Sequence, residues 1–210
     1  QSFRLMEPTS VIKTLKNELK FSESSIKKLR IYHDSILEFN KRYNLISKST
    51  EKTIWFRHIL DSAQIVRFLD SKSPNKIADF GSGAGFPGLV VGIFSSDSRF
   101  HVKLYEKSPV KRAFLRDIKN KLNLKNIEIK SNIYEGKIES NIIVCRAFKK
   151  LSDILKISRE IIKKPHKMII LKGKNAQSEI NNVSLGMNYR YKLRDSMTDH
   201  DSKIILVDVK

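Results

Sequence analysis

The stretch Asp79-Phe80-Gly81-Ser82-Gly83-Ala84-Gly85-Phe86-Pro87-Gly88 decides the fold expected for this 210-residue chain. It follows an apolar run at 77–80 that is typical of a buried strand, and it precedes an apolar run at 89–93 that fits a helix. Glycine lets the backbone turn with positive φ and approach a ligand closely. The following helix presents free N–H groups, and Pro87 is expected in its first turn. The stretch therefore predicts a ligand-binding strand–turn–helix unit.

The chain after this turn alternates between short β-rich runs and helical patterns. Helical periodicity is found around 113–118 and over 151–162. Strands are expected at 102–105, 127–129, 142–145, 168–171, 189–193 and 204–209. Strands that alternate with helices favour an α/β fold with a mostly parallel sheet and right-handed crossovers.

The first 70 residues are predicted to be helical. Apolar residues recur at helical spacing over 11–19, 29–43 and 59–66, and Ser22 is a plausible N-cap of the second helix. The run Ser-Lys-Ser-Pro-Asn at 71–75 breaks this pattern. We therefore expect a helical N-terminal cap over residues 1–72 and a core over residues 73–210, joined in one compact unit.

The charge of the chain predicts an anionic partner. Lys and Arg number 41 and Asp and Glu number 22, so the formal net charge is +19, and the isoelectric point is about 10.0. A globular chain this basic is attracted to polyanions, of which nucleic acid is the commonest. The alternative is coding bias, because the chain is rich in Lys, Ile and Asn, but bias explains the excess over acidic residues less well.

Several classes of protein are excluded by composition. Cys145 is the only cysteine, which excludes a disulfide framework and a cysteine-rich zinc site. The histidines show no metal-ligand spacing, so no metal is expected. No apolar run reaches the roughly 18 residues of a membrane span, and residues 1–4 lack a signal-peptide core. We expect a soluble, cytoplasmic, monomeric protein that makes no contact with membranes.

Two ligands compete for the glycine-rich turn. The spacing Gly83-x-Gly85-x-x-Gly88 matches the dinucleotide fingerprint, with Glu106 about 18 residues further on as an acceptor for ribose hydroxyls. That spacing alone does not discriminate. A carboxylate at Asp79 suits a ligand with an ammonium and a sulfonium, and it is poorly placed beside a pyrophosphate. S-adenosylmethionine is therefore favoured, and an NAD-dependent oxidoreductase is the alternative.

Further motifs place these residues in a known context. They are Asn40-Lys41-Arg42-Tyr43-Asn44-Leu45, Arg57-His58-Ile59-Leu60-Asp61-Ser62, Arg146-Ala147-Phe148 and, more weakly, Leu171-Lys172-Gly173. Together with the glycine-rich turn, the chain resembles the bacterial RsmG (GidB) family, which methylates N7 of a guanine in small-subunit (16S) ribosomal RNA. The matches run in family order from about residue 10 to the C-terminus.

The resemblance implies a class I, Rossmann-like methyltransferase with a seven-stranded sheet and an N-terminal helical extension. It also implies cofactor contacts at Gly81, Phe86, Ile133, Tyr134 and Arg146. The family usually has Arg before the pair that matches Ile133-Tyr134 and an acid as its second member, whereas Asn132 and Tyr134 stand here. The cofactor-binding residues expected in full are Asp79, Gly81, Gly83, Gly85, Phe86, Glu106, Ile133, Tyr134 and Arg146.

The chemistry of guanine N7 requires little of the protein. N7 carries a lone pair and no proton, so no catalytic base is required, and positioning supplies the rate. The strand at 142–145 is not followed by an Asn-Pro-Pro-Tyr type motif, and Cys145 follows Val144 rather than Pro, so it is predicted to be a buried strand residue. Arg146 is expected to position cofactor or guanine, or alternatively to form a surface ion pair.

Basic side chains are the expected RNA contacts. His58 and Asp61 are three apart and so share a helix face, where they cap the cofactor pocket or make a local packing contact. The unperturbed pKa of His58 would be about 6.5. A non-catalytic RNA-binding module is the alternative from another class, and either naked RNA or an assembled ribosomal subunit fits as partner. The expected RNA contacts are Arg57, His58, Lys107, Lys111, Arg112 and Lys172.

Overall fold

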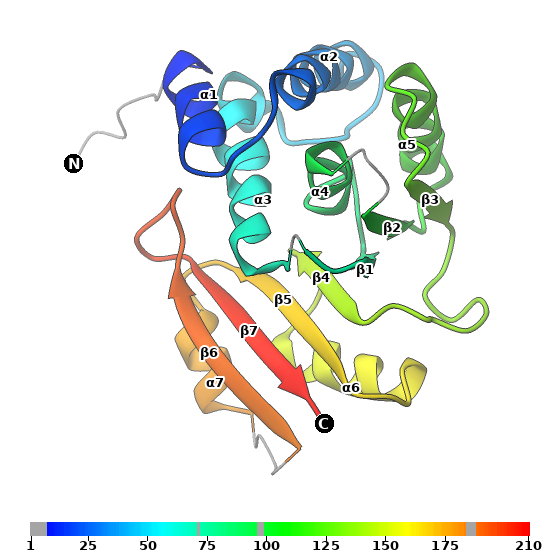
Figure 1. The fold of residues 1–210 in the computed structure, drawn as a ribbon, viewed down its shortest axis with the longest axis vertical. Coiled ribbons are helices and arrows are strands. Elements are labelled where there is room, and N and C mark those ends of the chain that lie inside the picture. The colour runs from blue at the N-terminus through cyan, green and yellow to red at the C-terminus, as the bar shows by residue number, and fades with distance from the viewer. Residues whose placement is uncertain (1–7, 71, 96–98, 184–187) are drawn as a thin grey trace.

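A computed structural model describes residues 8–70, 72–95, 99–183 and 188–210 (Figure 1). Within these ranges one sheet is formed by seven strands: β1 (Asn75–Phe80), β2 (Phe100–Tyr105), β3 (Ile127–Lys130), β4 (Ile142–Arg146), β5 (His166–Lys172), β6 (Tyr189–Asp195) and β7 (Lys203–Val209). Their order in the sheet is β3-β2-β1-β4-β5-β7-β6. The pairs among β1 to β5 are parallel, whereas β7 is antiparallel to both β5 and β6. The predicted mostly parallel, seven-stranded α/β fold is confirmed.

Helices cover both faces of this sheet (Figure 1). The helices that alternate with the strands are α4 (Gly88–Phe94), α5 (Pro109–Lys121), α6 (Leu151–Ile161) and α7 (Ala176–Asn181). Apolar side chains of α4 and α5 pack with one face of the sheet, and those of α6 and α7 pack with the other face. Each predicted strand is present and extends by at most a few residues beyond its apolar run. Cys145 is fully buried on β4, as predicted.

The N-terminal segment is helical but less regular than its sequence pattern predicts. Its helices are α1 (Pro8–Asn17) and α2 (Glu23–Asn40), followed by a 3-10 turn η1 (Lys48–Thr53), a π-helical turn η2 (Trp55–Leu60), a short α3 (Asp61–Ala63) and a 3-10 turn η3 (Gln64–Phe68). The predicted N-cap is confirmed, because the Ser22 hydroxyl accepts a hydrogen bond from the Ser25 N–H at 3.1 Å. The prediction of one regular helix over 59–66 is wrong in detail, because π-helical, α-helical and 3-10 turns follow one another there.

Helix α2 ends earlier than its apolar pattern suggests. The Asn40 side-chain oxygen accepts hydrogen bonds from the backbone N–H groups of Leu45 and Ile46 at 2.8 and 3.2 Å. These bonds hold the chain in a turn after Asn40, so Tyr43 lies beyond the helix. Asn and Asp side chains commonly compete in this way with helical hydrogen bonding.

The N-terminal helices share a core with the sheet. Leu15, Tyr32 and Ile59 are fully buried in the same apolar cluster as Ile77 and Leu104 of β1 and β2. The predicted compact unit therefore fits the packing, whereas the boundary between residues 72 and 73 stays a prediction. Ser71, in the predicted break, lies outside the described residues.

Candidate active site

The glycine-rich turn, residues 81–88, connects the end of β1 to α4. Gly81, Gly83 and Gly85 all have positive φ, at 72°, 58° and 107°. A Cβ added to Gly83 would meet no described atom within 4 Å, so this glycine faces open space. A Cβ on Gly85 would lie 2.7 Å from the Tyr32 hydroxyl, and one on Gly88 would lie 2.6 Å from Asp79 Oδ2. Open space for a ligand is thus found at Gly83, whereas Gly85 and Gly88 allow the turn to pack against the protein.

Asp79 lies beneath this turn and is fully buried. Its Oδ2 accepts a hydrogen bond from the Gly88 N–H at 2.9 Å, at the start of α4. Pro87 is therefore the N-cap of α4 rather than a residue of its first turn. Asp79 Oδ1 has no hydrogen-bond partner in the described part of the chain. Burial raises the pKa of this carboxyl to about 7. A buried, unpartnered carboxylate oxygen fits a ligand that carries positive charge.

Glu106 follows the last residue of β2 and ties two elements together. Its Oε2 accepts a hydrogen bond from the Gly83 N–H, and its Oε1 accepts one from the Ser108 N–H, both at 2.8 Å. Ser108 in turn caps α5, because its hydroxyl accepts from the Lys111 N–H. Each Glu106 oxygen keeps a second lone pair that a ribose hydroxyl could use.

A cavity of about 410 Å³ lies at this edge of the sheet. Its lining includes Gly81, Glu106, Ile133 and Tyr134, four of the residues expected at the cofactor. Ile133 is buried and Tyr134 is 54% exposed. The volume is within the range of small-molecule pockets. The structure therefore brings the glycine-rich turn and the segment after β3 to one cavity that fits an adenosine-sized ligand.

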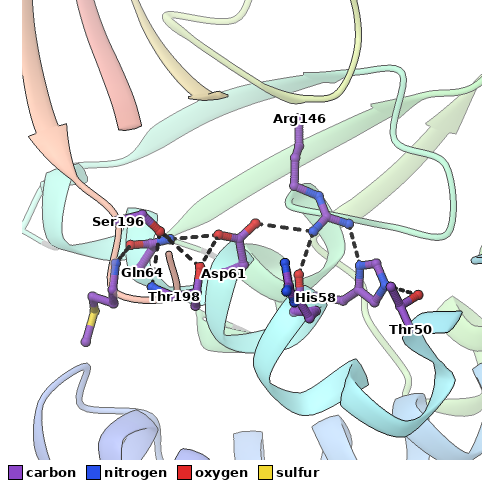
Figure 2. Close-up of polar contacts among 9 residues, drawn as sticks. Thr50, His58, Asp61, Gln64, Arg146, Ser196 and Thr198 are labelled. Atoms are coloured by element: carbon purple, nitrogen blue, oxygen red, sulfur yellow. Dashed lines mark hydrogen bonds and ion pairs between the residues drawn. The ribbon is translucent and has the colours of Figure 1, made fainter. Parts of the chain in front are cut away.

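Arg146, the last residue of β4, is held by the N-terminal segment (Figure 2). One guanidinium nitrogen donates to the Arg57 carbonyl at 3.0 Å and to Asp61 Oδ2 at 3.2 Å, and the other donates to His58 Nδ1 at 2.8 Å. The Arg146 side chain is 19% exposed, and its guanidinium lies 5.0 Å from the centre of the Phe86 ring. Arg146 thus forms an ion pair with Asp61 within a partly buried network.

His58 is neutral in this network. Because Arg146 has only donors, His58 Nδ1 accepts, and its Nε2–H donates to the Thr50 hydroxyl at 2.9 Å. Burial and the nearby Arg146 lower the pKa of His58 to about 3. The pKa of His58 in the folded protein is therefore well below its unperturbed value of about 6.5. The imidazole also stacks on the Phe86 ring, with centroids 5.1 Å apart.

Asp61 extends the network to the turn between β6 and β7 (Figure 2). Its Oδ1 accepts from the Thr198 hydroxyl at 2.8 Å and from Gln64 Nε2 at 3.0 Å. The Gln64 side-chain oxygen accepts from the Met197 N–H at 2.8 Å. Sequence reasoning missed Gln64 and Thr198. Nothing local marks Thr198. At Gln64 a polar amide between apolar residues of a helical run was a weak signal.

The expected RNA contacts differ in their exposure and in their partners. Lys107 and Arg57 are exposed, and Lys111 is half-buried. Arg112 donates to the backbone carbonyls of Glu106 and Lys107 at 2.8 and 2.6 Å, so it supports the loop after β2.

Lys172, the last of these candidates, lies in a second cavity of about 340 Å³, which Asp61, Arg146 and Glu179 also line. Within the described ranges, no three His, Cys, Asp or Glu side chains are grouped to hold a metal ion. No described helix is both long and apolar enough to cross a membrane.

Fold and turn together define a class I, Rossmann-like methyltransferase architecture. A SAM dependent methyltransferase from Aquifex aeolicus superimposes with a TM-score of 0.53 at 15% identity, covering 88% of this chain and 97% of that one. A precorrin-6y C5,15-methyltransferase from Geobacter metallireducens gives a TM-score of 0.52 at 13% identity, covering 80% and 91%. At such low identity these likenesses show the fold alone.

Sequence comparison identifies the family. Residues 25–203 match the GidB model, described as rRNA small subunit methyltransferase G. The protein named ribosomal RNA small subunit methyltransferase G from Pelagibacter ubique is 35% identical over 180 residues, which cover 83% of this chain and 84% of that one. Its namesake from Rickettsia felis is 36% identical over 183 residues, covering 87% and 92%. The chain belongs to this family, and the NAD-dependent alternative is not favoured.

Proposed function

We propose that the chain transfers a methyl group from S-adenosylmethionine to N7 of a guanine in small-subunit (16S) ribosomal RNA. The observation that carries the proposal is the open turn at Gly83, tied to Glu106, in a chain whose relatives are named as small-subunit ribosomal RNA methyltransferases. The atom N7 comes from the resemblance to the RsmG family.

The residues around the turn fit the cofactor. Glu106 would accept the ribose hydroxyls, and Ile133 and Tyr134 would flank the adenine in the cavity of about 410 Å³. Asp79, with its unpartnered Oδ1, would face the positive charge of the ligand. When bound, the cofactor supplies an electrophilic methyl group on a positively charged sulfur. The remaining contacts proposed are Gly81, Gly83, Gly85 and Phe86.

The protein would act on the reaction by positioning. Guanine N7 carries a free lone pair, so no side chain has to remove a proton. Holding nucleophile and methyl group in line can contribute about 7–11 kcal/mol to lowering the barrier. Arg146 is a positioning residue in this proposal, because three of its five N–H groups donate to the Arg57 carbonyl, His58 and Asp61 while its guanidinium lies on Phe86.

Basic side chains would hold the RNA by its phosphates. The net charge of +19 and the exposed Lys107 and Arg57 support this part of the proposal. Half-buried Lys111 would contribute from the first turns of α5. Because the proposed substrate is ribosomal RNA, we propose that the protein acts in the cytoplasm and as a monomer.

The test is methyl transfer from labelled S-adenosylmethionine to small-subunit RNA and to small ribosomal subunits, with mass mapping of the modified nucleotide. We expect one guanine methylated at N7, and calorimetry should show binding of S-adenosylmethionine but not NAD. Gly83→Val should abolish both binding and transfer, because a branched side chain would be strained at positive φ and would fill the open space. RNA binding without any transfer would favour the non-catalytic module instead.

A further inference from the structure

The second cavity, beside Arg146, contains charged groups whose hydrogen bonding can be followed one by one. It has a volume of about 340 Å³ and is lined by residues at the ends of β4 and β5 and by the start of β7. This is large enough for a small ligand. Asp61, Arg146, Lys172, Glu179 and Lys203 are its strongly charged lining residues with described partners.

Three of these five side chains are held by other partners, although Arg146 keeps two of its five N–H groups and Lys203 keeps two of its three ammonium protons. Asp61 accepts from Arg146 with one oxygen and from Gln64 and Thr198 with the other. Arg146 donates to three acceptors of the N-terminal segment. Lys203 pairs with Asp195 at 2.5 Å. These groups form the wall of the cavity.

The Lys172–Glu179 pair retains capacity for a ligand. Lys172 Nζ donates to the Lys149 carbonyl at 2.6 Å and lies 3.1 and 2.9 Å from Glu179 Oε1 and Oε2. The two hydrogen bonds, to the Lys149 carbonyl and to Glu179 Oε1, use two of the three ammonium protons, so the third is shared between Oε2 and a ligand. Glu179 Oε2 also accepts from the Leu151 N–H at 2.6 Å, whereas the described partners of Oε1 include only Lys172. One acceptor site thus remains on Oε1, beside the shared third proton of Lys172.

We infer that the Lys172–Glu179 pair selects guanine by its O6 and N1–H groups. The inference rests on the proposed function and names the residues that choose the base. Guanine presents an acceptor, O6, next to a donor, N1–H, which matches the Lys172 donor and the Glu179 acceptor. Adenine presents a donor, N6–H₂, next to an acceptor, N1, which opposes both partners.

The same contact leaves the reacting atom accessible. In guanine O6 lies between N1 and N7, so a base held by O6 and N1–H has N7 on the side away from Glu179. The two side chains are only 12% and 23% exposed. At such partly buried positions an unmatched polar partner is costly, and sites built on hydrogen bonds reject analogues that lack them.

The test compares guanine, inosine and adenine at the mapped target nucleotide of otherwise identical RNA or subunits. We expect the parent protein to give inosine a kcat/KM within a few-fold of guanine, because inosine keeps O6 and N1–H. The kcat/KM for RNA with adenine at this position should be lower than that for guanine by about a hundredfold or more. Glu179→Gln should reduce the guanine-to-adenine ratio by about tenfold or more, since the amide offers adenine N1 a donor.

The ratio separates base selection from a structural role. Glu179 also caps the start of α6, but a disturbed fold would lower both rates together and leave their ratio unchanged. Glu128→Gln is the matched control, because Glu128 pairs with Lys103 at 3.5 Å in a cavity at the opposite edge of the sheet. The guanine-to-adenine ratio of Glu128→Gln should equal that of the parent protein. Lys172→Gln, which removes the charged donor to O6, is the second variant if Glu179→Gln does not fold.

Each failure has its own signature. A parent protein that methylates none of the RNAs would overturn the proposed function and this inference together. Guanine methylation with an unchanged guanine-to-adenine ratio in folded Glu179→Gln or Lys172→Gln would overturn the inference alone. So would rejection of inosine as strong as that of adenine.

Discussion

At the scale of the residue, Asp79 combines a burial cost with a proposed binding role. Its folded-state pKa of about 7 is above the ordinary value of 3.8, because burial disfavours the charged carboxylate. The folded protein therefore holds a proton that the unfolded chain releases near pH 4. The contribution of Asp79 protonation to the free energy of unfolding is fully present below about pH 4 and is lost as pH rises through about 7.

A cationic ligand next to Asp79 would favour the carboxylate, so binding should release a proton. We expect the affinity for S-adenosylmethionine to rise by about tenfold from pH 6 to 8 through this group. The measurement is calorimetry in buffers of different ionisation enthalpy. Asp79→Asn, titrated in parallel, corrects for ionisation of the ligand itself. Equal pH dependence in the two proteins would contradict the placement of the ligand's charge.

Glu106 is the residue on which ribose binding is predicted to depend. Glu106→Ala should weaken S-adenosylmethionine binding by about 1.5–3 kcal/mol, the scale of hydrogen bonds to a charged group. Part of this loss would come from the Gly83 N–H, which would lose its acceptor. Glu160→Ala on α6, where the side chain is exposed, is the control. Equal losses in both variants would indicate that Glu106 has no role at the ligand.

At the scale of the element, Asp61 joins the N-terminal segment to β4 and to the turn between β6 and β7. Asp61→Ala should lower the free energy of unfolding by about 2–3 kcal/mol, because Arg146, Gln64 and Thr198 would each lose a partner. Urea denaturation measures this change. Asp195→Ala removes a pair in which the aspartate is 86% exposed, so it should lower the free energy of unfolding much less than Asp61→Ala does. Similar losses in the two variants would show that the network does not hold these elements together.

At the scale of the whole molecule, the reaction is expected to be independent of pH. Single-turnover rates at saturating cofactor should be nearly flat from about pH 6 to 8.5, because no base has to titrate. His58, the nearest candidate base, has a pKa of about 3 and stays neutral across this range. His58→Asn should retain most of the chemical rate. A tenfold rise with pH that disappears in this variant would point to a target atom that must lose a proton.

The net charge of the molecule predicts how its two ligands respond to salt. RNA affinity should fall steeply with salt, with a log–log slope of about −0.7 for each phosphate contact on a single strand. Changing Lys107 and Lys111 to Ala together should flatten the slope. The affinity for S-adenosylmethionine should hardly change, either with added salt or in the lysine variant. A slope near zero in the parent protein would remove nucleic acid from the proposal.

The sequence by itself determined those properties of this protein that depend on a few neighbouring residues or on a sum over all residues. The strand, turn and helix around Gly81–Gly88, the seven β-rich runs and the N-cap at Ser22 were all predictable, because periodicity, backbone freedom and capping act over a few residues. The position of Glu106 after β2 was also predictable, since every parallel strand brings its end to the same edge. Net charge is a sum over residues and needs no structure.

Only the tertiary structure decided what depends on residues far apart in the chain. Asp61 and Thr198 are 137 positions apart, and Arg146 and His58 are 88 apart, so no local pattern links them. Their contact, with burial, lowers the pKa of His58 and holds the Arg146 guanidinium against the N-terminal segment. Likewise, Gly83 and Gly85 look equivalent in sequence, yet one faces open space and the other faces Tyr32. Burial and long-range contact arise only when the helices close over the sheet, because they depend on where other segments of the chain come to lie.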